Sequence, residues 1–132
     1  MKNHKKILIV DDDENIRDVL TQSLVAKKYN VLQARNGQEG LEMALKEHPD
    51  LILLDMLMPI MDGMTTLKNI RKDPWGEDVP VIILTNLNAT NENTVEDMVS
   101  NKPLHYLIKS NWKISEVIKM MKKHSTLNKS IL

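Results

Sequence analysis

The segment LLDMLMPIMDG, residues 53–63, joins the end of an apolar run to a carboxylate and a turn. Four apolar residues in a row, Leu51 to Leu54, indicate a strand that is buried on both faces, and this strand ends on the carboxylate of Asp55. A buried charge costs free energy unless it is paired or bound to a metal ion. The segment therefore predicts a strand whose last residue has a chemical role.

Around this stretch, short apolar runs alternate with segments whose apolar residues recur at helical spacing. The predicted strands cover residues 6–10, 30–34, 51–54, 79–84 and 104–108, and the predicted helices cover residues 14–28, 38–47, 64–72, 91–100 and a segment from Ile114. The apolar residues expected to face the core are Ile16, Val19, Leu20 and Leu24, then Leu41, Ala44 and Leu45, then Met64, Leu67 and Ile70, and finally Ile114, Val117, Ile118 and Met121. A breaker at 73–76 precedes the fourth strand, and the tail from Ser125 is expected to fray. This alternation predicts an α/β domain with a parallel sheet and helices on both faces.

The composition limits the classes of protein to which the chain can belong. The chain has 132 residues, the size of one domain, and its eighteen basic and eighteen acidic residues cancel, so net charge does not favour nucleic acid or membrane binding. Cysteine is absent, which excludes disulfides, thiolate metal sites and a catalytic thiol. The apolar run at 7–10 is too short for a signal peptide or a membrane span. We expect one cytoplasmic domain over residues 1–132, with a core at 5–124 and no room for an output module.

Polar residues stand where the predicted strands end. The run 11–13 of three aspartates follows the first strand, Asp55 ends the third, Thr85 ends the fourth, and the fifth runs through Tyr106 to Lys109. In an open parallel sheet, ligands bind beyond the carboxyl ends of the strands, at the switch in strand order. If the order is 2-1-3-4-5, this switch lies between the first and third strands, the two that end in aspartate.

Three carboxylates in one crevice would repel one another unless a cation neutralises them. Oxygen ligands suit Mg²⁺, which also prepares a carboxylate to attack a phosphoryl group. Lys109 could counter phosphate charge, and Thr85 could donate its hydroxyl to a phosphate oxygen. Taken singly, such residues are more often structural, and it is their joint placement at one edge that favours a site. Asp12 or Asp13 is expected to cap the next helix, and Asp13 is placed outside the metal shell.

Other phosphate and metal motifs fail at specific positions. No glycine-rich loop follows the first strand, so dinucleotide and P-loop sites lack their anion cradle. The Asp-x-Asp-x-Asn pattern at 11–15 is like the start of a calcium loop, but Ile16 and Gln22 stand where that loop needs Gly and Glu. A phosphatase of the haloacid dehalogenase type would carry Asp-x-Asp at its nucleophile, and Leu57 occupies the second position.

Taken together, four segments resemble the receiver domain of the two-component response regulators. They are ILIVDDDENIR (7–17), LILLDMLMPIMDG (51–63), VIILT (81–85) and YLIK (106–109). The match covers residues 5–124, and four motifs in the family's order are highly specific. The resemblance implies a stand-alone, CheY-like receiver with a flavodoxin-like fold, in which five helices flank a five-stranded parallel sheet of order 2-1-3-4-5.

The resemblance also implies the acidic side of the site. Asp55 would be the phosphoacceptor, which explains why a buried strand ends in a carboxylate. Mg²⁺, with Mn²⁺ as an alternative, would be held by Asp11, Asp12 and Asp55 and by the backbone carbonyl of Leu57. The chain would then be no enzyme beyond catalysing its own phosphorylation and dephosphorylation.

On the other side of the site, the resemblance implies that Thr85 and Lys109 bind the phosphoryl group and that Tyr106 moves with Thr85. A sensor histidine kinase would supply the phosphate. A protein effector or a second receiver would bind the face made by the fourth helix, the fifth strand and the fifth helix. Direct contact with nucleic acid or a membrane is not expected.

Three departures from the family pattern stand close to the motifs. Ser110 replaces a proline whose peptide bond is usually cis, and a cis bond without proline costs about 3 kcal/mol. Asn86 replaces a small residue after the threonine, and the segment 101–103 replaces a Gly-Ala pair before the tyrosine. None of these changes removes a phosphotransfer residue. A phosphorelay shuttle, an interaction module without physiological phosphorylation and a Mg²⁺-dependent phosphatase remain as alternatives.

Overall fold

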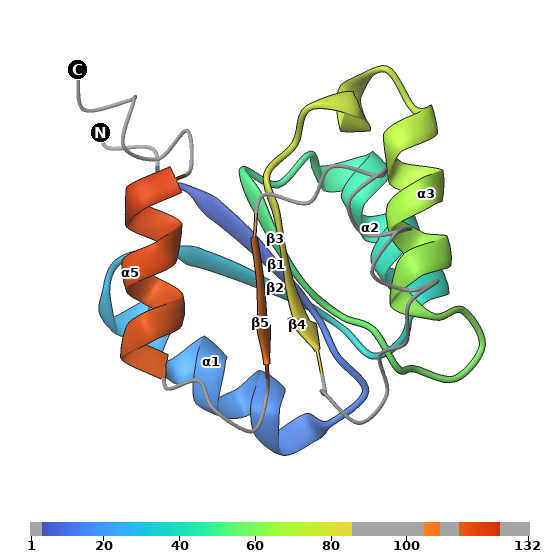
Figure 1. Cartoon of the computed structure of the whole chain (residues 1–132). Coiled ribbons are helices and arrows are strands. Elements are labelled where there is room, and N and C mark those ends of the chain that lie inside the picture. The colour runs from blue at the N-terminus through green and yellow to red at the C-terminus, as the bar shows by residue number, and fades with distance from the viewer. Residues whose placement is uncertain (1–3, 86–104, 109–113, 125–132) are drawn as a thin grey trace.

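A five-stranded parallel sheet forms the centre of the molecule (Figure 1). The computed structural model describes residues 4–85, 105–108 and 114–124. The strand order is β2-β1-β3-β4-β5, and all four neighbouring pairs are parallel, so the predicted order is confirmed. The strands are β1 (Lys6–Val10), β2 (Asn30–Ala34), β3 (Leu51–Asp55), β4 (Val81–Thr85) and β5 (His105–Ile108).

Helices cover both faces of this sheet, as expected for a flavodoxin-like fold. They are α1 (Glu14–Ala26), α2 (Gly37–Glu47), α3 (Gly63–Lys72), α5 (Ile114–His124) and the 3₁₀ helix η1 (Trp75–Glu77). α2 and α3 lie on one face, and α1 and α5 lie on the other (Figure 1). The helix predicted over 91–100 and the tail from Ser125 fall outside the described residues. Within the described ranges, no helix combines the length and the apolar composition needed to cross a bilayer.

Two predicted boundaries were wrong by two residues. The first helix ends at Ala26, because Lys28 adopts a positive φ of 75°, which does not continue a helix. The fourth strand begins at Val81, because Pro80 has no amide hydrogen to donate to the ladder. The breaker predicted at 73–76 is partly helical, since η1 begins inside it.

Two apolar layers hold the sheet between its helices. Every residue of β3 is buried, as the apolar run predicted. Side chains alternate between the faces, so neighbouring residues of one strand join different layers. Burying one large aliphatic side chain stabilises the fold by about 1.5–3 kcal/mol, so these layers make a rigid base for the loops at the strand ends. The layer under α2 and α3 contains Leu8, Val10, Ile52, Leu54, Leu67 and Ile70, and the layer under α1 and α5 contains Ile7, Ile9, Leu51, Leu53, Leu20, Leu24, Val117 and Met121.

The buried face of α1 differs from the prediction. Val19 was expected to face the core, but its side chain is 49% exposed, whereas Arg17 is only 8% exposed. Arg17, Leu20 and Leu24 are spaced three and four residues apart and therefore share one helix face, from which Val19 is rotated away. Leu45 of α2 also points to solvent. Among the residues predicted to face the core, those found buried are Leu20, Leu24, Ala44, Met64, Leu67, Ile70, Val117, Ile118 and Met121.

Candidate functional site

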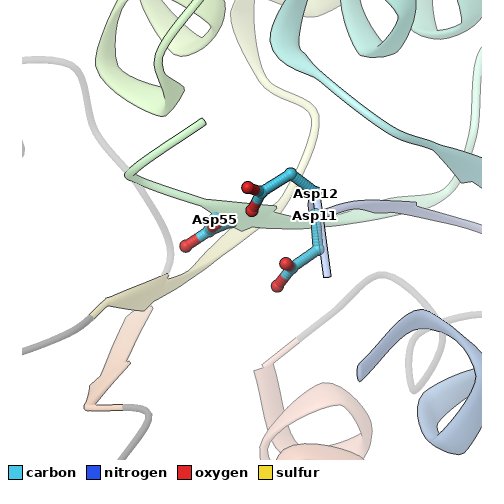
Figure 2. A group of neighbouring side chains, drawn as sticks. All are labelled: Asp11, Asp12 and Asp55. Carbon is cyan, nitrogen blue, oxygen red and sulfur yellow. The ribbon is translucent and has the colours of Figure 1, made fainter. Parts of the chain in front are cut away.

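Three carboxylates meet at the carboxyl edge of the sheet, where the sequence predicted a site. Asp11 and Asp12 follow β1, and Asp55 is the last residue of β3. β1 and β3 pair directly, with Val10 opposite Leu54, so the residues that follow them are neighbours. Each aspartate offers one carboxylate oxygen, and these three oxygens all lie within 4.8 Å of one another (Figure 2).

The three carboxylates differ in their exposure to solvent. Asp11 is fully buried and Asp55 is 3% exposed, whereas Asp12 is exposed. Two of the carboxyl groups are therefore held within the fold, and the third lies at the surface of the cluster. An ion arriving from solvent would meet Asp12 and the inner pair together.

Asp13 lies outside this cluster and caps α1. Its side chain accepts hydrogen bonds from the amides of Asn15 at 2.9 Å and Ile16 at 3.3 Å. Its own amide donates to Oδ1 of Asp11 at 2.9 Å. The prediction that one of these aspartates caps the helix, with Asp13 outside the metal shell, agrees with this geometry.

Arg17 is a residue of this region that sequence reasoning did not single out. Its Nη1 donates to the backbone oxygen of Asp11 at 2.8 Å, and its Nε donates to Oε1 of Gln33 at 3.1 Å. Gln33 in turn donates through Nε2 to the hydroxyl of Thr21 at 2.8 Å. The available signal was the position of an arginine three residues before Leu20, on the buried face of the predicted helix.

The loop after Asp55 is closed by backbone hydrogen bonds. The Gly63 amide donates to the Met56 carbonyl at 2.9 Å, and the Met61 amide donates to the Pro59 carbonyl at 2.7 Å. Ile60 has a positive φ of 72°, an unusual conformation for a β-branched residue, and its side chain is 80% exposed. Inside this loop the Leu57 side chain is 57% exposed and contributes little to packing, and its backbone carbonyl as a metal ligand stays a prediction.

Gly63 allows the loop to return to β3. A Cβ atom at this position would overlap the carbonyl oxygen of Asp55 and would lie 2.8 Å from Cα of Met56. Asp62 caps α3 by accepting the Thr65 amide at 2.8 Å. The MDG sequence at 61–63 thus starts α3 directly against the residue that ends β3.

The predicted phosphoryl-binding residues are described only in part. Thr85 ends β4 opposite Ile108, and Tyr106 lies in β5 opposite Ile83, so the backbones of both residues belong to neighbouring strands. β4 also pairs with β3, with Leu84 opposite Asp55, which places Thr85 at the same edge as the carboxylates. Lys109, Ser110, Asn86 and the segment 101–103 fall outside the described residues.

The turn between β2 and α2 adds a charged group near this edge. Donation from the Arg35 amide, at 2.9 Å from Oε1, is the main cause that lowers the pKa of Glu39 below its ordinary value. The guanidinium of Arg35 also pairs with Glu39 at 3.2 Å, and the charge of Arg17 lowers the same pKa further. Arg17 thus contacts the acidic loop, residues 11–13, through its hydrogen bond to the Asp11 carbonyl, and its charge acts on Glu39 at the start of α2.

The donor set of the cluster fits a hard divalent cation. It consists of carboxylate oxygens, with no imidazole or thiolate in the group. Mg²⁺ prefers such oxygens and keeps several waters, which an exposed member such as Asp12 permits. A cation here would also offset the mutual repulsion of three close carboxylates.

Comparisons with known proteins agree with this geometry. The family model described as the response regulator receiver domain matches residues 7–122. A probable transcriptional regulator ycf27 of Porphyra purpurea is 44% identical over 88 residues, which are 66% of this chain and 35% of that protein. The DNA-binding dual master transcriptional regulator RpaA of Synechocystis is 42% identical over 82 residues, which are 62% of this chain and 34% of that protein. The chain spans about a third of the length of these curated relatives.

Solved structures extend the likeness to nearly all of the chain. The chemotaxis protein CheY4 of Vibrio cholerae has a TM-score of 0.83 at 26% identity, covering 92% of this chain and 99% of that one. The receiver domain of the sensor histidine kinase PA1611 of Pseudomonas aeruginosa has a TM-score of 0.81 at 25% identity, covers 92% of this chain and 98% of that one, and holds a magnesium ion in its active-site cleft. With the family match, the strand order and the aspartates at the ends of β1 and β3, the chain belongs to the response regulator receiver domain family of two-component systems.

Proposed function

We propose that the chain is a phosphoacceptor of a two-component system, in which Asp55 takes a phosphoryl group from a sensor histidine kinase. The observation that carries this proposal is the position of Asp55, a buried carboxylate at the end of β3 whose oxygen lies within 4.8 Å of those of Asp11 and Asp12. Two further carboxylates at this distance would only repel an aspartate that had a purely structural role. The cytoplasm, where such a kinase presents its phosphohistidine, is the proposed location.

Asp11, Asp12 and Asp55, with the backbone carbonyl of Leu57, would hold Mg²⁺, and Mn²⁺ would suit the same oxygen donors. When bound, the ion neutralises oxygens that would otherwise repel an incoming phosphate. Burial of Asp11 and Asp55 keeps competing water away from the inner pair. Exposure of Asp12 leaves the approach open from the carboxyl edge of the sheet.

In the proposed reaction, a carboxylate oxygen of Asp55 forms a bond to phosphorus while the bond between phosphorus and the donor histidine nitrogen breaks. The leaving imidazole keeps the electron pair and takes up a proton. Thr85 and Lys109 bind the phosphoryl oxygens, with the lysine offsetting their charge. The chain modifies only its own side chain, so it is not an enzyme acting on a separate substrate.

The output follows from the strands that carry Thr85 and Tyr106. In this proposal, a movement of Thr85 toward the phosphoryl group is coupled to an inward turn of Tyr106, and the direct pairing of the strands that carry them, β4 and β5, supports this coupling. The face made by the fourth helix, β5 and α5 then changes shape, and a protein effector or a second receiver binds there. No direct contact with nucleic acid or a membrane is part of this proposal.

A phosphorelay shuttle is the second candidate, because a structural neighbour is the receiver domain of a sensor histidine kinase. The two functions use the same Asp55 and differ in the fate of the phosphoryl group. Rapid transfer from phosphorylated Asp55 to a histidine phosphotransfer protein would favour the shuttle. A pure interaction module would bind its partner equally well with Asp55→Asn.

The test is incubation with acetyl phosphate and MgCl₂, followed by intact-mass measurement. We expect one phosphoryl addition that is stable in acid, labile in base and absent when EDTA removes the metal. Asp55→Asn should lose the addition and keep the circular dichroism spectrum of the wild type. Asp18→Asn is the matched control, since it makes the same change at an exposed aspartate of α1 outside the cluster and should be phosphorylated normally. Modification that persists in Asp55→Asn would overturn the assignment, and turnover of a generic phosphate ester would instead indicate a phosphatase.

A further inference from the structure

One buried guanidinium, that of Arg17, donates a hydrogen bond to the main chain of the acidic loop. Arg17 is 8% exposed, and its Nη1 donates to the carbonyl oxygen of Asp11 at 2.8 Å. Asp11 is the residue at which the chain leaves β1, and its amide donates to the Ala34 carbonyl of β2 at 3.1 Å. Its Oδ1 accepts the amide of Asp13 at 2.9 Å. The peptide groups around Asp11 are therefore fixed on both sides.

The guanidinium itself is fixed by a chain of side chains that ends on its own helix. Nε of Arg17 donates to Gln33 of β2 at 3.1 Å, and Gln33 donates to Thr21 of α1 at 2.8 Å. Thr21 stands one helical turn after Arg17, so the network closes on itself and leaves the guanidinium little freedom. β2, α1 and the acidic loop are joined at this single group.

We infer that Arg17 is a positioning residue for the metal site, which it serves by fixing the main chain of Asp11 so that Asp11 and Asp12 face Asp55. This inference rests on the proposed function of the site. Groups that orient metal ligands from behind typically change metal affinity by a factor of about 10–100 when removed. Arg17 acts here on the backbone of a ligand residue, a role that the sequence analysis did not assign to it.

A competing effect has the opposite sign, which makes the inference testable. A positive charge close to a cation site repels the cation, so a purely electrostatic Arg17 would weaken Mg²⁺ binding, and its removal would tighten it. A positioning Arg17 strengthens binding, and its removal weakens it. The direction of the change therefore decides between the two roles.

The experiment compares Mg²⁺ titrations of wild type, Arg17→Met and Arg17→Lys by calorimetry, using MgCl₂ alone as the probe. We expect about a tenfold loss of affinity in Arg17→Met and a partial recovery in Arg17→Lys, which keeps one donor for the Asp11 carbonyl. Arg71→Met is the matched control. Arg71 also donates to two backbone carbonyls, those of Gly76 at 2.8 Å and Val79 at 2.7 Å, but it does so before the start of β4, at the opposite edge of the sheet. The Arg71→Met variant should be less stable than wild type but should bind Mg²⁺ with the same affinity.

A second measurement needs no metal, so it separates failure of this inference from failure of the proposed function. Amide hydrogen exchange in metal-free protein should show faster exchange of the Asp13 amide in Arg17→Met than in Arg71→Met. If wild type bound no Mg²⁺, the proposed function would fail, and this exchange rate would still decide whether Arg17 orders the loop. Where Arg17→Met does not fold, Gln33→Leu takes its place, with a smaller change in the same direction. Tighter Mg²⁺ binding in Arg17→Met, or equal Asp13 exchange in the two arginine variants, would overturn the inference.

Discussion

The Asp12→Asn variant should be more stable than wild type without metal and less stable than wild type in magnesium. Asparagine keeps the size of the side chain and removes its charge. Asp11 is adjacent in sequence, so its repulsion of Asp12 persists in the unfolded chain, whereas the approach to Asp55 is created by folding. Two unit charges 4.8 Å apart repel by about 0.9 kcal/mol at the permittivity of water and by about 3.5 kcal/mol at an effective permittivity of 20. Because Asp12 is exposed, the lower end applies, and relief of about 1 kcal/mol is expected.

The control for this experiment is Asp13→Asn, which removes the same charge one residue further along. Asparagine is as good a helix cap as aspartate, so this variant keeps the cap and loses only the favourable interaction of a negative charge with the start of α1, about 0.5 kcal/mol. Asp12→Asn should therefore be the more stable of the two in EDTA. The difference isolates the repulsion within the cluster from the general effect of charge at a helix start.

Thermal unfolding with and without magnesium is the assay. For 132 residues, about 1 kcal/mol corresponds to a shift in Tm of about 4 °C. Mg²⁺ at ten times its dissociation constant adds about 1.4 kcal/mol to a protein that binds it, and Asp12→Asn should gain little of this. The order of the two melting temperatures, wild type and Asp12→Asn, should thus reverse when magnesium replaces EDTA. If Asp12→Asn melts below wild type in EDTA, or gains as much as wild type from magnesium, Asp12 is not part of a shared cation site.

Two further predictions concern the supports of the site. Gly63→Ala should lower the free energy of unfolding by about 2–3 kcal/mol, because the new methyl group overlaps the Asp55 carbonyl. Urea denaturation measures this change. An unchanged free energy of unfolding would show that the loop after β3 moves freely. Glu39→Gln should cost about 0.5–1 kcal/mol at pH 7, because the Arg35 amide favours the ionised carboxylate and so lowers its pKa. A lowered pKa stabilises the fold at pH values above the ordinary pKa of glutamate. The difference in unfolding free energy between wild type and Glu39→Gln should therefore vanish as the pH falls through the pKa of folded Glu39. A difference that stays constant in acid would contradict this reasoning.

The sequence predicted most of the sheet because its signals are local. β1 and β2 have the predicted bounds, since the apolar run of β1 ends at the aspartates 11–13 and the short strand β2 ends just before the turn at Asn36 and Gly37. The acidic cluster followed from one topological rule, that parallel strands bring their carboxyl ends to one edge. Asp55 and the Asp11–Asp12 pair could therefore be placed together without knowledge of any contact.

What the sequence did not reveal depends on side chains that act against their usual preference. Arginine is rarely buried, so apolar periodicity assigned the inner face of α1 to Val19 and passed over Arg17. Ile60 is β-branched and disfavours a positive φ, so no propensity predicts its conformation. Both exceptions lie within the loops or helix that surround the carboxylates, where the fold is shaped by the site as well as by packing.

The strand order also has a consequence for how the site comes into being. β1 and β3 are neighbours in the sheet, so all three carboxylates belong to the first 55 residues, and the acidic half is complete once β3 has joined β1. Thr85 and Tyr106 belong to β4 and β5, which add to the outer side of β3. In a chain synthesised from its N-terminus, all three carboxylates are therefore available for assembly while β4 and β5 are still being translated. The part of the sheet that carries the carboxylates meets the part that carries Thr85 and Tyr106 along the border between β3 and β4.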